Sequence, residues 1–283
     1  MSMTKITLQS RNGEHITIST VTNFPQAFAE SKKHPAVVVA HPGGGVKEQT
    51  AGLYARKLAE AGFVTIAFDA SYQGESTGEP RQLENPYTRT EDISAVIDYL
   101  TTLPYVDGDR IGAMGICAVN IGSMFRNGWD NNITSADAIP VLENGSKART
   151  AEAGGAATVT IPLAPLRKED APNKELEEAR EYYHTSRCQY PTAPGVATAR
   201  SLDQIITYDA YNTAEVFLTQ PLQIVTGSLA GSKWMSDDLY ERAASTNKKF
   251  HVVEGSNHMQ LYDVAKYVDE AVSVLAAFFR TSL

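Results

Sequence analysis

The sequence predicts an α/β protein with a mostly parallel central sheet and flanking helices. Short apolar runs without polar alternation occur at 36–40, 63–68 and 110–114, as in strands that are buried on both faces of a parallel sheet. Helical segments lie between these runs, at 50–61 and 87–103. Strands that alternate with helices favour parallel pairing through right-handed crossovers. These two observations define the expected fold class.

A hairpin is expected before this series. Residues 5–9 and 15–21 alternate polar and apolar side chains on either side of the turn Arg11-Asn12-Gly13. The helix at 50–61 is expected to end at Gly62, because glycine is a common residue at helix ends.

The alternation of strands and helices stops after residue 123. Residues 123–212 are rich in Ala, Gly, Pro, Tyr and charged residues, with one clear helical segment at 173–183. We interpret this segment as a helical cap inserted into the core, so that residues 1–122 and 213–283 form the two parts of the core. The second part is expected to contain strands and helices at 221–226, 236–244, 249–253 and 264–279.

Composition argues against several classes of function. The chain has 283 residues and a formal net charge of −8, which argues against a nucleic-acid-binding surface. The first residues lack the apolar core of a signal peptide, and no stretch approaches the ~18 consecutive apolar residues of a membrane span. There are two cysteines, Cys117 and Cys188. Two cysteines are too few for a disulfide framework in a chain of this length. We therefore expect a cytoplasmic protein with free thiols.

Cys117 is the candidate nucleophile. The stretch Gly115-Ile116-Cys117-Ala118 directly follows an expected strand, as a nucleophile at a sharp strand-to-helix turn requires. The helix dipole would favour the thiolate there, and the backbone N–H of Ala118 would face a developing oxyanion. The alternative is a buried core cysteine without chemistry.

Two further loops complete the candidate site. His41-Pro42-Gly43-Gly44-Gly45 follows a strand, and the N–H groups of Gly43 or Gly44 could supply the second oxyanion donor. His258 lies between the last strand and the last helix, where a catalytic base would come after the nucleophile in chain order. A single histidine in a loop is more often a surface residue without a catalytic role. The position of His258 between the last strand and the last helix favours the role of catalytic base. Neither His nor Cys residues show metal-ligand spacing, so we expect no metal site.

Four motifs, HPGGG, FDASYQGES, GICA and NHMQLYD, carry a family resemblance along the whole chain. In this order they resemble α/β hydrolases of the dienelactone-hydrolase-like branch, some of which carry a peptidase-like label. The resemblance implies a Ser- or Cys-His-acid hydrolase of small esters, lactones or thioesters, without a cofactor. Asp69 in the second motif is expected to be structural. Cap aromatic residues are expected to shape an apolar pocket: Trp129, Tyr182, Tyr183 and Tyr190.

The family pattern breaks after Cys117. Val119 occupies the place of the second elbow glycine, and the stretch from Val119 to Trp129 resembles the segment that relatives have after their next sheet strand. A helix, a strand and their loops would total roughly 25–35 residues. We therefore expect an internal deletion near Ala118 and Val119, which would leave a gap beside the central strand. An unusually short crossover is the alternative.

The acid of the expected triad is not assigned. Residues 227–232 contain no carboxylate where the family often has Asp. Asp237 and Asp238 look like members of the following helix, and Glu254 could orient His258 or simply pack at the sheet edge. A cysteine nucleophile tolerates a weak acid better than serine does, because its thiolate forms more easily.

Three functions stay open at this point. The first is hydrolysis, with attack by Cys117 and proton transfer by His258. The second is a catalytically degenerate hydrolase-fold protein with a binding role, and the third is a redox-reactive thiol without turnover. A homo-oligomer is possible, although nothing in the sequence demands one.

Overall fold

The computed structural model describes residues 2–117 and 121–283, and its main sheet has five strands in the order β1-β2-β4-β3-β5. These strands are β1 (Met3–Gln9), β2 (Thr17–Asn23), β3 (His34–Ala40), β4 (Val64–Phe68) and β5 (Val106–Gly115). The β1–β2 hairpin is antiparallel and joins β4 antiparallel, whereas β4, β3 and β5 run parallel. The predicted α/β class and the predicted hairpin are therefore confirmed.

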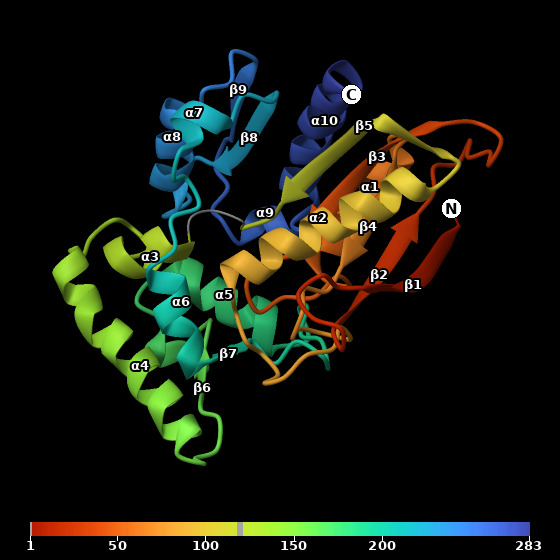
Figure 1. The fold of residues 1–283 in the computed structure, drawn as a ribbon. Helices are drawn as coiled ribbons and strands as arrows, with labels where there is room; N and C mark the ends of the chain where they lie inside the picture. Colours follow the sequence, from red (N-terminus) through yellow and green to blue (C-terminus); the bar gives the residue numbers. More distant parts are fainter. Residues whose placement is uncertain (1, 118–120) are drawn as a thin grey trace.

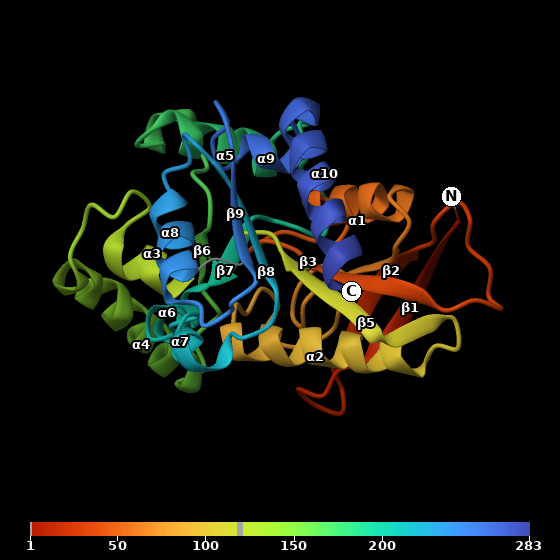
Figure 2. The same cartoon turned by 90° about the horizontal axis from the view of Figure 1, so that it is seen from above.

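Helices cover both faces of this sheet, as Figure 2 shows. They are α1 (Thr50–Glu60) and α10 (Ala265–Ser282) on one side and α2 (Pro86–Thr102) on the other. Alternate residues of β3 divide between the two faces: Val37 and Val39 pack with Leu58 of α1, and Val38 packs with Leu100 of α2. This two-sided burial explains the apolar run that lacks polar alternation.

The motif after β4 is a structural turn. Asp69 is fully buried, and its carboxylate accepts hydrogen bonds from the backbone N–H and the ammonium group of Lys47, at 2.8 and 2.7 Å. It also accepts from the N–H of Glu75 at 2.9 Å. Gly74 has φ +53°, and a Cβ there would lie 2.3 Å from the Asp69 carboxyl group. Glycine is therefore needed for the turn to close around Asp69.

A second sheet contains only the parallel pair β8 (Leu222–Gly227) and β9 (Lys248–Val253). Within the described ranges, β8 is not paired with β5, so the predicted continuous central sheet is divided in two. We also predicted that the strand at 110–114 would be buried, which is wrong for part of it. Ala113 and Gly115 are exposed, because β5 is an edge strand.

The elements within 123–212 form a group beside the core, green in Figure 1. The helix predicted at 173–183 is present as α5 (Lys174–His184). A 15-residue helix, α4 (Ile139–Ala153), was not predicted, because only Gly145 of it is buried and it therefore lacks an apolar face. The other elements between residues 121 and 217 are α3 (Ile121–Asn127), η1 (Ser135–Ala138), β6 (Thr160–Pro162), η2 (Lys168–Asp170), β7 (Val196–Thr198), η3 (Ala199–Ser201), α6 (Leu202–Ile206) and α7 (Ala214–Phe217).

Candidate active site

Cys117 follows β5 directly and adopts a left-handed backbone conformation, with φ 54°. This region is unfavourable for a residue with a side chain, and such conformations are enriched at functional sites. The helix α3 starts four residues further on, at Ile121. The strand end and the strained residue are the parts of the predicted turn that lie within the described residues.

His258 lies in the loop between β9 and α9 (Gln260–Asp263), and the structure brings it to Cys117. The His258 and Tyr262 side chains line the same cavity as the Cys117 thiol, and both act to lower its pKa. The Tyr262 hydroxyl is also 3.1 Å from Nε2 of His258. Two loops more than one hundred residues apart in the chain thus place a thiol, an imidazole and a phenol together.

The surroundings of Cys117 favour its thiolate. Burial acts to raise the pKa of the Cys117 thiol, but His258, the Tyr262 hydroxyl and the Arg89 guanidinium outweigh burial and lower that pKa below its ordinary value. Burial raises the pKa of Tyr262 well above its usual range, so this phenol stays protonated and can donate to the sulfur. A neighbouring phenol, Tyr183, likewise has a raised pKa through burial.

Arg89 holds the loop that starts at His41. Its guanidinium donates to the His41 carbonyl at 3.1 Å and to the Glu84 carboxylate at 2.9 Å. The His41 ring is buried between the Pro42 carbonyl and the backbone N–H of Ala70, at 2.7 and 3.0 Å from Nδ1 and Nε2. Burial, assisted by Arg89, lowers the pKa of His41 to about 3. This histidine is therefore a neutral structural group.

The predicted oxyanion donors are only partly placed. A Cβ on Gly43 would lie 3.6 Å from Ile121, so this loop lies beside the helix that follows Cys117. Gly44 has φ +69°, and the N–H of Gly45 donates to the Pro42 carbonyl at 3.0 Å. Neither Gly43 nor Gly44 is among the described residues that line the cavity at Cys117. Ala118, the other predicted donor, lies outside the described residues.

Ser232 is the side-chain partner of Nδ1 of His258, where the resemblance led us to expect an acid. Its hydroxyl lies 2.7 Å from Nδ1 of His258, and its side chain is buried. Of the carboxylates considered from the sequence, Glu254 is exposed and accepts from Ser228, and Asp237 pairs with Lys233. The orienting partner of His258 is thus a neutral hydroxyl, which lies just before α8 (Lys233–Arg242) and which sequence reasoning missed.

A buried carboxylate joins three parts of the site. Glu175, on α5, accepts from the backbone N–H of His258 at 2.5 Å and from that of Gly231 at 3.0 Å. It also accepts from the indole N–H of Trp129. The Trp129 ring packs edge-on against the ring of His258, with centroids 4.9 Å apart. Glu175 therefore fixes the loops that carry the His258 ring and its orienting hydroxyl.

The other cap aromatic residues differ in placement. Tyr183 is close enough to Cys117 for its pKa to respond to the thiol charge. Tyr182 is buried and accepts a hydrogen bond from the backbone N–H of Thr50, which is a structural contact. Tyr190 is 37% exposed and makes an isolated backbone bridge with Ala193.

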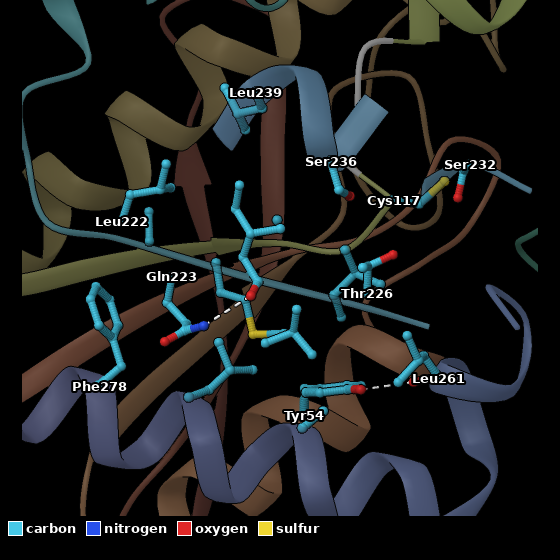
Figure 3. Close-up of a pocket in the computed structure, with 18 of the residues that line it drawn as sticks. Tyr54, Cys117, Leu222, Gln223, Thr226, Ser232, Ser236, Leu239, Leu261 and Phe278 are labelled. Atoms are coloured by element: carbon cyan, nitrogen blue, oxygen red, sulfur yellow. Dashed lines mark hydrogen bonds between the residues drawn. The ribbon is translucent and has the colours of Figure 1, made fainter. Parts of the chain in front are cut away.

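A cavity of about 340 Å³ adjoins Cys117 and His258. We predicted a pocket shaped by the cap aromatic residues, and this is wrong for this cavity: it lies between β5 and β8, against α8 and α10. Figure 3 shows Cys117 and Ser232 at one end and Leu222, Gln223 and Phe278 at the other. The reason is the division of the sheet, which opens the core beside β5.

The described part of the chain holds no group of three or more His, Cys, Asp or Glu residues placed to bind a metal ion. Within the same residues, no helix combines the length and apolar character needed to span a bilayer.

A mixed sheet with helices on both faces, and with a strained cysteine and a histidine beyond its strand ends, defines the fold of an α/β hydrolase. The family model described as "Dienelactone hydrolase family" matches residues 24–123. The uncharacterized protein YcjY of Escherichia coli (strain K12) is 61% identical, with complete coverage of both chains. The chain belongs to the dienelactone hydrolase family.

Two more distant relatives are similar to most of this chain. An uncharacterized protein of Pseudomonas aeruginosa is 31% identical over 92% of this chain and 76% of its own length. Its crystal structure has a TM-score of 0.89, with coverage of 100% of this chain and 94% of that one. A protein of Eupenicillium brefeldianum named thiohydrolase is 21% identical over 95% of this chain and 93% of its own length.

Proposed function

We propose that this protein hydrolyses a carboxylic ester, lactone or thioester of a small molecule, with Cys117 as nucleophile and His258 as proton carrier. The observation that carries the proposal is the placement of Cys117, which has a left-handed backbone conformation at the end of β5 and shares one cavity with His258 and Tyr262. The distant relative named thiohydrolase supports thioesters as one substrate class.

The reaction would proceed in two steps. The Cys117 thiolate attacks the carbonyl carbon, and the C–O or C–S bond to the leaving group breaks while His258 protonates that group. Water then attacks the thioester formed on Cys117, with His258 as base. This step releases the carboxylic acid of the substrate and regenerates the Cys117 thiol. Ser232, at Nδ1 of His258, would hold the imidazole in the required orientation.

Substitution of Cys117 tests this proposal. The parent should turn over some members of a panel of p-nitrophenyl esters, acyl thioesters and lactones, and Cys117→Ala should lower kcat by at least about a thousandfold. The control is Cys188→Ala, because Cys188 is the other free thiol and burial raises its pKa. This variant should retain parental turnover.

Two outcomes would contradict the proposal. Undiminished turnover in Cys117→Ala would assign the activity to another group. An inactive parent that still unfolds cooperatively by circular dichroism would favour the binding role. If peroxide modification of Cys117 were then the only reaction detected, the redox-reactive thiol would be the better interpretation.

A further inference from the structure

The cavity beside Cys117 separates two strands that face each other without pairing. It is lined by Ala113–Cys117 on one side and Pro221–Thr226 on the other. In Figure 3, Leu239 of α8 and Phe278 of α10 lie on opposite sides of these strands. The space is therefore bounded by two strand edges and two helices, as the place of a buried sheet strand would be.

The edge of β5 that faces away from β3 is open to pairing. The N–H of Ile116 donates to the Ala40 carbonyl of β3 at 3.1 Å. The N–H and C=O groups of successive strand residues point to opposite edges of the strand. Because Ile116 faces β3, the N–H and C=O groups of Gly115 and Ala113 point away from β3. Both residues are exposed, whereas β4, in the same sheet, is buried throughout. Unpaired groups of this kind form a template for another strand.

The length of the alignment with the E. coli relative is a second observation. The alignment spans 306 positions and covers all of both chains, although this chain has 283 residues, so the relative has residues where this chain has none. The sequence pattern breaks at Val119, two residues after Cys117, where β5 has just ended. A strand inserted at this point would follow β5 in the chain.

We propose that the cavity between β5 and β8 is a binding site for one extended, apolar peptide segment, which adds to the open edge of β5 as a further strand. The segment carries apolar side chains on both faces, since Leu239 and Tyr211 lie on one side and Leu275 and Phe278 on the other. The backbone hydrogen bonds hold the peptide, and the apolar side chains select it. The site adjoins Cys117, but peptide binding does not require that Cys117 act as a nucleophile.

A peptide with the residues that the E. coli relative has in excess is the probe. Binding is measured by fluorescence anisotropy of the labelled peptide, with hydrogen exchange of the protein in parallel. The bound peptide should slow exchange at Ala113 and Gly115 by at least about tenfold and raise the Tm with peptide concentration.

Two substitutions at one position separate strand pairing from burial in the cavity. Ala113→Pro removes an N–H from the open edge without removing a donor to β3, so it should keep the fold and abolish peptide binding. Ala113→Val keeps the N–H and suits a strand, so it should bind as the parent does. Circular dichroism of both variants checks the fold.

Three results would overturn the proposal: no binding of the soluble peptide, binding without protection of Ala113 and Gly115, or equal binding by both variants. Capture of decanoate in place of the peptide would show an apolar ligand pocket instead. If the peptide is insoluble, its residues are spliced between Ala118 and Val119. A higher Tm than that of the parent then supports the strand site, and an unchanged or lower Tm contradicts it.

Discussion

At the scale of single residues, the environment of Cys117 is the feature with the clearest chemical consequence. The side chains of His258, Tyr262 and Arg89 together lower the pKa of its thiol, against the effect of burial. The thiolate should therefore be populated below the ordinary cysteine pKa of about 8.5.

The pH dependence of alkylation tests this expectation. The rate of Cys117 modification by iodoacetamide should reach half its maximum at a lower pH than the rate for a free cysteine does, and Tyr262→Phe should move this midpoint upward, because one group that lowers the pKa is lost. Mass spectrometry of the Cys117 peptide measures the rate. A midpoint at or above that of a free thiol would show that burial dominates.

Ser232 offers a second test at this scale, because its neutral hydroxyl lies where an acid would stabilise a protonated His258. Ser232→Asp should raise kcat, by roughly tenfold, since a carboxylate at Nδ1 stabilises the imidazolium. The asparagine of Ser232→Asn has the same shape as aspartate but no charge, so this variant should not raise kcat. Steady-state kinetics on one substrate of the panel compares the three proteins. An equal gain in both variants would refute the electrostatic explanation.

At the scale of secondary-structure elements, local sequence signals account for most of the core. The helix α2 begins after Asn85, whose side chain accepts from the backbone N–H groups of Tyr87 and Thr88 at 2.9 and 3.3 Å. Pro86 occupies the first helical position, where no N–H is needed. The helix carries Arg89 and so supports the His41 loop.

Removal of this cap should weaken the whole domain. Asn85→Ala should lower the free energy of unfolding by about 1 kcal/mol, because two N–H groups lose their partner. Asn85→Ser, which can still cap, should retain most of that stability. Urea unfolding followed by circular dichroism compares them. Equal losses in both variants would mean that contacts other than capping are responsible.

Elements that could not be predicted lacked a local signal. The helix α4 has almost no buried side chain, so its sequence shows no apolar stripe. The helix is held by close tertiary contacts of Gly145 in place of an apolar stripe. A Cβ at Gly145 would lie 2.7 Å from the backbone nitrogen of Asp203, which indicates that the backbones of α4 and α6 approach closely. A small residue allows such packing but does not predict a helix on its own.

At the scale of the whole molecule, His41 should make stability depend on pH. Its pKa is about 3 in the folded protein, against an ordinary value near 6.5. Between these values the unfolded chain binds a proton that the folded protein does not. The free energy of unfolding is therefore lost as the pH falls from about 6.5 to about 3, by up to about 1.4 kcal/mol per pH unit.

Urea unfolding between pH 7 and pH 4 measures this slope. His41→Gln, which has a donor and an acceptor but does not titrate, should flatten it. The matched control is His15→Gln at an exposed position, which should leave the slope unchanged. A slope that persists in His41→Gln would assign the acid sensitivity to other groups.

The sequence by itself determined the α/β class, the order of the core elements and the positions of Cys117 and His258 at strand ends. These features depend on periodicity and on strand-to-helix turns, which are local in the chain. The sequence also led us to expect a deletion near Ala118 and Val119, and this expectation stays a prediction because both residues lie outside the described ranges.

Only the tertiary structure decided which groups surround the thiol. Arg89, Tyr262, Ser232 and Glu175 come from four distant segments, and their roles depend on distances of a few ångströms that no local pattern encodes. The division of the sheet and the cavity between β5 and β8 are likewise properties of packing. Strand edges become open or paired only when all strands are in place, so the sequence could suggest the gap but not its walls.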